Sequence, residues 1–240
     1  MLDSDVTFRH VLPAFALALT LLAAPVAGAQ TKLTPPPASA SRAQVRGYAQ
    51  AVADQVDQYW KAQAPALKFA YSTPVIRWTT DQNEDGPCDG TFMYDSDTTT
   101  VCLDLSSSPD DEDESFVENI QSGLPGIVVY SIGHEWGHHI QKQRHQESTA
   151  DIDINIELQA DCYAGMFMKS FAASGSFTDK DLKDVLADAR RVGDDPNAPI
   201  SERDHGTPKQ RADAVSRGFN GAAPLACEPL RTKTPDSSGS

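Results

Sequence analysis

The sequence predicts an α+β fold in which a small antiparallel sheet packs on one helix and a second helix with polar positions lies opposite. Residues 126–144 combine apolar residues at helical spacing with a pair of histidines, which predicts the first helix. A run of good helix formers from Glu157 onward predicts the second. Three short segments at 74–80, 91–94 and 99–105 are rich in β-branched and aromatic residues and predict the strands.

The composition suits one globular domain, which we expect to span residues 41–230. The chain has 240 residues, of which 40% are hydrophobic, and a formal net charge of −14. That is enough apolar material for a core. The negative charge repels nucleic acid and anionic membrane surfaces, so neither is an expected partner.

Residues 1–29 are predicted to be a signal peptide. An apolar run over residues 11–29 follows a short basic start and ends in Ala27-Gly28-Ala29, the small-residue pattern of a cleavage site. The run is nearly long enough to cross a bilayer, so a retained membrane anchor over residues 11–29 is the alternative. Pro13 and Pro25 favour the signal peptide. The sequence therefore predicts a secreted or periplasmic protein.

The start of the mature chain divides into two parts. Residues 30–40, QTKLTPPPASA, are predicted to be a Pro-rich linker that buries nothing. Ser41 and Gln44 then form a capping-box pattern for a helix that extends to about Ala64. Apolar residues at helical spacing along this helix indicate a core-facing stripe.

Two acidic segments invite a metal-binding interpretation. Asp81, Asn83 and Asp85 copy the start of a calcium loop, but Phe92 stands where an EF-hand needs a bidentate glutamate. An EF-hand is therefore excluded, and a looser calcium site or a polar turn remains open. Residues 106–115, SSSPDDEDES, are predicted to be a solvated acidic loop.

The four cysteines predict two disulfides in an exported protein, although three pairings are possible and free buried thiols are the alternative. Cys88 and Cys102 flank a predicted hairpin, so their pairing is the local choice. Cys162 and Cys227 would then join the end of the chain to the second helix. The sequence has no C-x-x-C pattern, which argues against a zinc site built on cysteine.

The sequence His134-Glu135-Trp136-Gly137-His138 predicts a metal site on the first helix. Residues four apart on a helix project from the same face, so His134 and His138 can bind one zinc ion. Glu135 is the next residue around the helix and can reach a metal-bound water as general base. His139 and His145 lie off this face and are predicted to be on the helix surface.

A third protein ligand must come from elsewhere in the chain. A third histidine on the same helix is excluded, because Arg144 stands at the required position and His145 is out of register by one residue. Glu157 on the second helix is the predicted third ligand. Asp161, one turn later, is predicted to accept a hydrogen bond from a ligand histidine and orient it.

The C-terminal half carries two further candidates. His205 is the predicted donor to a developing oxyanion, with Arg211 supporting it or contacting substrate. The alternative is a surface histidine and an arginine on a helix face. Thr178 and Asp181 predict the start of a helix that ends near Arg191, while Thr207 and Pro208 begin another that Gly218 stops. Residues 231–240 are predicted to be disordered.

Four sequence blocks together resemble the neutral zinc metallopeptidases of bacteria, a zincin-like group with a glutamate as third ligand. The blocks are HEWGHHIQ, ELQADCYAG, GDD and HGTPKQR, and the resemblance runs from Tyr71 to Cys227. It implies a zincin-like metallopeptidase domain with His134, His138 and Glu157 as ligands and Glu135 as catalytic base. It also implies an active-site role for His205 and the arginine that follows it. One departure is that the family often has a Gly-Pro-Phe-Tyr-Cys run where this chain has residues 90–94, GTFMY, so that the cysteine of this run has moved to Cys102.

These observations predict an exported zinc peptidase that acts on a peptide or protein substrate. Two alternatives remain open: a zinc-binding or envelope-assembly protein without proteolytic turnover, and an amidase that acts on a non-peptide or cell-wall amide.

Overall fold

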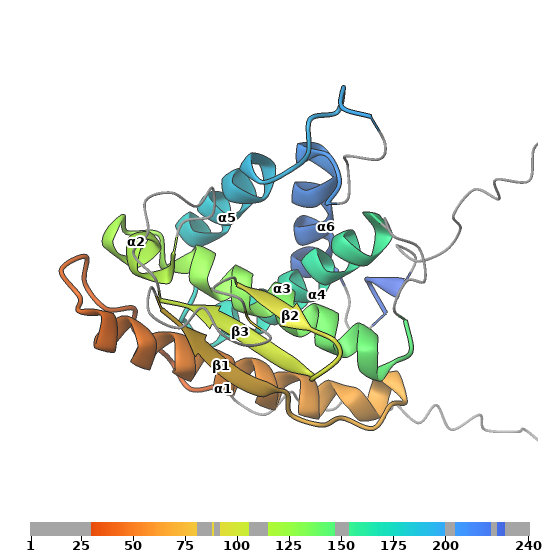
Figure 1. Ribbon diagram of the computed structural model, residues 1–240, viewed down its shortest axis with the longest axis horizontal. Helices are drawn as coiled ribbons and strands as arrows, with labels where there is room; N and C mark the ends of the chain where they lie inside the picture. The colour runs from red at the N-terminus through yellow and green to blue at the C-terminus, as the bar shows by residue number, and fades with distance from the viewer. Residues whose placement is uncertain are drawn as a thin grey trace, which may run out of the picture.

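The computed structural model describes residues 30–80, 88, 92–105, 115–146, 154–199, 205–221 and 225–228 (Figure 1). In order, the elements are α1 Arg42–Leu67, β1 Val75–Thr79, β2 Met93–Asp95, β3 Thr100–Asp104, α2 Phe116–Gln121, α3 Pro125–Gln143, α4 Ile154–Ala173, α5 Asp179–Arg191 and α6 Pro208–Asn220. The α+β prediction is confirmed. The predicted signal peptide, the calcium-like residues Asp81, Asn83 and Asp85, the acidic segment 106–114 and the tail 231–240 lie outside the described residues.

The three strands form a mixed sheet with the order β1-β3-β2, so the prediction of an antiparallel sheet is wrong for one of its two strand pairs. The strands β2 and β3 pair antiparallel, as a short connection requires, with Tyr94 opposite Val101. The strand β1 runs parallel to β3, with Val75 opposite Thr100. The strand β2 lies on the far side of β3 from β1, although it precedes β3 in the chain. As a result β3, whose Val101–Leu103 segment is buried, is central and β2 forms an edge.

Local capping fixes the starts of several helices. Ser41, Thr178 and Thr207 each cap a helix through a complete capping box. The helix α2, which the sequence analysis did not predict, begins with another such box at Ser115. The helix α6 continues past Gly218 instead of ending there. A methyl group at Gly218 would lie 1.9 Å from the Cys162 carbonyl oxygen, so this glycine permits close packing of α6 on α4.

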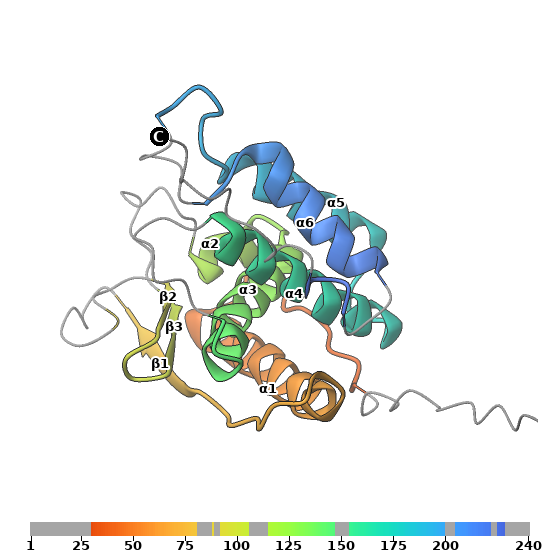
Figure 2. The same cartoon turned by 90° about the vertical axis from the view of Figure 1, so that its right-hand side faces the viewer.

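The helices α3 and α4 form a central layer between α1 and the α5–α6 pair, and the sheet lies beside α1 and α3 (Figure 2). Gly137 and Ala160 bring α3 and α4 together, because a methyl group on Gly137 would lie only 2.8 Å from the Ala160 Cα. Gly133 makes a similar approach to Ala164 one turn earlier. This close packing places the predicted ligand residues of the two helices opposite one another.

Two disulfides join the pairs Cys88–Cys102 and Cys162–Cys227, as predicted. Their Cα separations are 5.5 and 5.7 Å, ordinary values for a disulfide. Disulfides of this kind indicate an extracytoplasmic, oxidising location. Within the described part of the chain, no helix is both long and apolar enough to cross a membrane.

Residues 30–40 pack against the domain, contrary to the expectation that this segment buries nothing. The Leu33 side chain lies against the core, and its backbone N–H donates to Ser176 Oγ at 2.8 Å. The Gln55 side chain on α1 donates to the Thr31 carbonyl at 2.7 Å, and Ala40 is buried. Few apolar residues are needed because backbone hydrogen bonds hold the segment in place.

Candidate metal centre

Three of the predicted ligand residues, His134, His138 and Glu157, converge on one point. The two Nε2 atoms lie 3.1 Å apart, and the Glu157 oxygens lie 3.2 Å from His134 Nε2 and 3.3 Å from His138 Nε2. Ligands about 2.0–2.1 Å from a tetrahedral zinc ion are themselves about 3.3–3.4 Å apart, so the spacing fits. Two imidazoles and one carboxylate leave a fourth position, as in catalytic zinc sites.

His134 is held by a buried charged group. Its Nδ1 donates to Asp161 Oδ1 at 2.9 Å, which leaves Nε2 for a metal. Arg211 donates to both Asp161 oxygens at 2.9 Å, and the Tyr130 hydroxyl donates to the same carboxylate. Burial raises the pKa of Asp161, but Arg211 and His134 outweigh it and hold the pKa at about 2. Asp161 is therefore ionised, as its predicted orienting role needs.

Arg211 lies behind the ligand residues and not on a substrate-facing surface. Its side chain is buried among Asp161, Tyr130 and the α4 helix. The sequence analysis expected Arg211 to support His205 or to contact substrate. In the structure Arg211 donates to Asp161 and Tyr130, and its charge compensates that of Asp161.

His138 is held by a neutral group that the sequence analysis did not identify. Its Nδ1 lies 3.0 Å from Gln141 Oε1, three residues later on α3. Gln141 is 1% exposed and donates through Nε2 to the Ile156 carbonyl at 2.7 Å. Its spacing of three residues from His138 is the signal that could have found it.

In the metal-free protein the pKa values of both imidazoles, His134 and His138, are raised. Burial lowers the pKa of His134, but hydrogen bonds to Asp161 and Glu157 outweigh it and raise the pKa to about 10. Burial likewise lowers the pKa of His138, while its hydrogen bond to Glu157 raises it, and the net direction is upward. The same hydrogen bonds overcome the effect of burial on Glu157 and lower its pKa. Metal binding at this point must therefore displace protons.

Glu135 lies beside the converging ligand atoms and is itself buried. Burial raises its pKa, while the neighbouring His134 and His138 oppose that shift. The backbone N–H of Tyr94 on the edge strand β2 donates to its carboxylate. A carboxylate with a raised pKa next to a metal position is suited to take up and release a proton.

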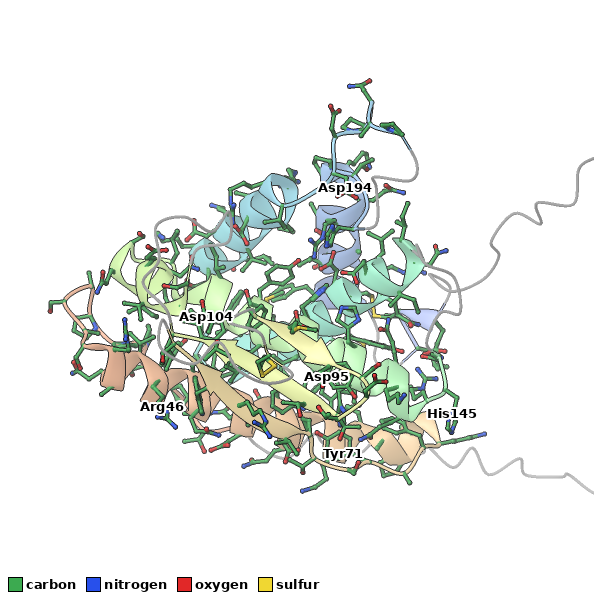
Figure 3. All side chains as sticks on the ribbon, in the orientation of Figure 1. Arg46, Tyr71, Asp95, Asp104, His145 and Asp194 are labelled. Atoms are coloured by element: carbon green, nitrogen blue, oxygen red, sulfur yellow. A yellow bond between two sulfur atoms is a disulfide. The ribbon has the colours of Figure 1, made fainter. Side chains whose placement is uncertain are left out.

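His205 lies on an exposed loop at the start of α6, with 51% of its side chain exposed. The Asp194 carboxylate accepts hydrogen bonds from the backbone N–H groups of His205 and Gly206, at 2.9 and 2.8 Å. Figure 3 labels Asp194 close to α6. A methyl group on Gly206 would lie 3.2 Å from Leu158 on α4, so this loop rests against the turn that carries Glu157. The loop that carries His205 thus lies on the side of α4 that holds Glu157, the predicted third ligand.

The expectation that His139 lies on the helix surface is wrong. Its ring is 1% exposed and bonds to the Tyr94 hydroxyl at 3.0 Å and the Ser72 carbonyl at 2.8 Å. Helical spacing put His139 off the ligand face, but the sheet covers that side of α3. His145 is exposed, as expected, at the periphery of the molecule (Figure 3). Trp136 Nε1 donates a hydrogen bond to the Tyr71 hydroxyl, so most side chains of the HEWGHH block have a hydrogen-bond partner of their own.

Comparison with known proteins agrees with the geometry. Residues 29–230 match the model of the family described as "Putative neutral zinc metallopeptidase". The uncharacterized protein YpfJ of Escherichia coli K12 is 32% identical over 150 residues, which are 53% of this chain and 50% of that protein. The uncharacterized protein Rv2575 of Mycobacterium tuberculosis H37Rv is 27% identical over 219 residues, which are 74% of this chain and 68% of that protein.

The chain thus spans about half the length of YpfJ. No solved structure matches it. The family match covers the HEWGHH helix, the α4 helix with Glu157, and the His205 loop. The zinc named in the family description agrees with the two imidazoles and one carboxylate that converge here. The chain therefore belongs to the family described as "Putative neutral zinc metallopeptidase".

Proposed function

We propose that the protein is an extracytoplasmic zinc peptidase that hydrolyses peptide bonds, with His134, His138 and Glu157 as zinc ligands. The observation that carries the proposal is the convergence of these three side chains beside a buried carboxylate, Glu135. Zinc at this point supplies a Lewis acid and lowers the pKa of a coordinated water. The two disulfides and the predicted signal peptide over residues 1–29 support export.

Glu135 acts as the general base in this proposal. It takes a proton from the attacking water and then passes it to the leaving amine. Its buried position favours both steps, because a raised pKa brings its proton affinity closer to that of its reaction partners. His205, on the loop beside the Glu157 turn, donates to the developing oxyanion.

A peptide substrate is supported by the edge of the sheet. Among the described strands β2 lies at the edge of the sheet, the position at which an extended peptide adds to a sheet. The backbone N–H of Tyr94 in β2 donates to Glu135, so this strand lies next to the proposed base. An extended peptide that added to this edge would lie across the catalytic residues.

The test combines zinc content with hydrolysis of casein and of a quenched-peptide library. Wild type is expected to hold about one zinc ion per chain and to cleave peptide. Glu135→Gln is expected to keep the metal and lose hydrolysis, and Glu157→Ala to lose both. Asp213→Asn, a carboxylate change on the exposed face of α6, serves as control and is expected to behave as wild type. Zinc binding without cleavage of any peptide would overturn the peptidase and direct attention to wall fragments or to a binding role.

The role of His205 has its own test. His205→Ala is expected to keep zinc and lower kcat about 100-fold, since one oxyanion donor contributes about this much. His145→Ala is the matched control, because His145 is also exposed but lies at the far end of α3. Equal activities of the two variants would remove His205 from the mechanism.

A further inference from the structure

A chain of buried amide groups connects His138 to the C-terminal disulfide. Gln141 faces His138 with its oxygen and donates through Nε2 to Gln159 Oε1 at 3.1 Å. Gln159, on α4, is fully buried and donates through its own Nε2 to the carbonyl of Cys227 at 3.4 Å. The chain of contacts therefore runs from a proposed metal ligand through two helices to residue 227.

The two ends of this chain fix the direction of both amides. A side-chain amide has one accepting oxygen and one donating nitrogen, whereas a backbone carbonyl can only accept. The Cys227 carbonyl requires the Gln159 nitrogen, which turns the Gln159 oxygen towards Gln141. The carbonyl of Ile156 requires the Gln141 nitrogen in the same way. The Gln141 oxygen is then left to face Nδ1 of His138.

This direction is the one that a zinc-binding histidine needs. When Nε2 of His138 binds a metal, its Nδ1 carries a proton and must donate. A reversed Gln141 amide would present a donor to a donor and leave both groups unsatisfied in a buried place. The orientation of Gln141 therefore sets the tautomer and the ring angle of His138.

Residues Cys227 and Glu228, at the C-terminal end of this series of hydrogen bonds, are bonded to α3 and α4. Cys227 is bonded to Cys162 on α4, one turn after Gln159. Glu228 pairs with Arg144 at the end of α3, and Arg144 also donates to the Tyr163 hydroxyl at 2.6 Å. The segment 225–228 thus bridges α3 and α4 and keeps the Cys227 carbonyl in place.

We propose that Gln141 is a positioning residue for His138, and that Gln159, anchored on the carbonyl of Cys227, sets the orientation of the Gln141 amide together with the carbonyl of Ile156. This inference rests on the proposed zinc site and deepens it, since it identifies what holds the second histidine. Residues 225–228 then contribute to zinc affinity although none of them is a zinc ligand.

The test measures the zinc dissociation constant by competition with a chromophoric chelator, in protein that carries Glu135→Gln to prevent self-cleavage. Gln141→Leu is expected to weaken zinc binding about 10-fold to 100-fold, as loss of a ligand-orienting group does. Gln159→Leu is expected to weaken it about fivefold, the effect of one hydrogen bond. Gln143→Leu is the matched control, because it changes the same residue type on the same helix at a side chain that bonds to Ser72, and zinc affinity should not change.

A second background tests the direction of the amide. Gln141→Glu presents an accepting oxygen to His138 in either orientation, so the effect of Gln159→Leu on zinc affinity is measured in this background against Gln141→Glu alone. In this background Gln159→Leu should no longer weaken zinc binding, because a carboxylate needs no orienting partner. Urea unfolding of the metal-free variants separates a loss of stability from a loss of affinity. The visible spectrum of the cobalt(II) form reports the ligand geometry, and it should shift in Gln141→Leu and stay unchanged in Gln143→Leu.

The outcomes distinguish this inference from the proposed function. If wild type binds no zinc, the proposed function and this inference both fail. If wild type binds zinc and Gln141→Leu binds it equally well, only the positioning role fails. If Gln159→Leu weakens binding equally in both backgrounds, Gln159 does not act through Gln141, and that step is overturned. Should Gln141→Leu not fold, the paired effects of Gln159→Leu in the two backgrounds still decide.

Discussion

The two histidines of the metal centre differ in what holds them, although they lie one turn apart on α3. His134 donates to Asp161, a fully buried carboxylate whose charge Arg211 compensates. His138 donates to Gln141, a neutral amide that continues into a second amide, Gln159. One side of the site is therefore held by charge and the other by the direction of hydrogen bonds.

The difference shows how a site limits its own negative charge. Glu135 and Glu157 already place two carboxylates at the metal position. A carboxylate behind each histidine would add two more, and each would need a buried counter-charge such as Arg211. An amide behind His138 orients the ring without that requirement. It gives less electrostatic support, so we expect the two sides to respond differently to mutation and to pH.

The largest expected difference is in the stability of the metal-free fold. Arg211→Met leaves the buried Asp161 without its counter-charge, which should lower the free energy of unfolding by about 3–5 kcal/mol. Gln141→Leu removes only neutral hydrogen bonds and should lower it by about 1–3 kcal/mol. Urea unfolding of both variants measures the two values.

Lys209→Met is the control for loss of a positive charge, because Lys209 is an exposed residue of the same helix as Arg211. It should leave the unfolding midpoint unchanged. Equal losses of unfolding free energy in Arg211→Met and Gln141→Leu would show that the charged contacts of His134 contribute no more stability than the neutral contacts of His138.

The next difference is in pH dependence. The folded-state pKa of His134 is about 10, above its ordinary value of 6.5, so its contribution to stability is complete below pH 6.5 and is lost as pH rises towards 10. The folded-state pKa of Asp161 is about 2, below its ordinary value of 3.8, so its contribution is present above pH 3.8 and is lost as pH falls towards 2. These two groups make the metal-free protein most stable between about pH 4 and 6.5.

The same shift couples zinc binding to proton release. At pH 8 zinc must displace the proton of His134, so calorimetric titrations in buffers of different ionisation enthalpy should show a release on the order of one proton. Asp161→Asn should reduce the release, because it removes a group that raises the pKa of His134. Gln141→Leu should preserve it. A release that is the same in wild type and Asp161→Asn would mean that Asp161 does not control the protonation of His134.

Much of this centre could be predicted because helical spacing is local information. His134, Glu135 and His138 are arranged by one turn of α3, and Glu157 and Asp161 by one turn of α4. The sequence could also indicate that the two helices face each other, since a zinc site needs a third ligand. For Gln141 it contained only the three-residue spacing from His138, which is common on any helix.

The remaining differences have a long-range origin. The parallel pairing of β1 with β3 depends on the order of the strands in the sheet, and strand periodicity does not encode that order. His139 is buried because the edge strand packs over its side of α3, which the helix alone could not reveal. Glycine often ends a helix, but Gly218 lies inside α6, where its small size permits close contact with Cys162. In each case a residue's role was decided by a neighbour distant in sequence.

The smallest expected effect concerns Tyr130, whose hydroxyl donates to Asp161 and accepts from Arg211 at 3.1 Å. Tyr130→Phe removes one donor from Asp161 but leaves the carboxylate paired with Arg211, so we expect a loss of about 1 kcal/mol in unfolding free energy. Tyr59→Phe is the control, because Tyr59 is a buried tyrosine whose ring packs in the core against Trp60 and Phe167. Zinc binding, measured by chelator competition, should weaken in Tyr130→Phe and stay unchanged in Tyr59→Phe. Equal zinc affinities in the two variants would show that the Tyr130 hydroxyl does not act on the metal centre through Asp161.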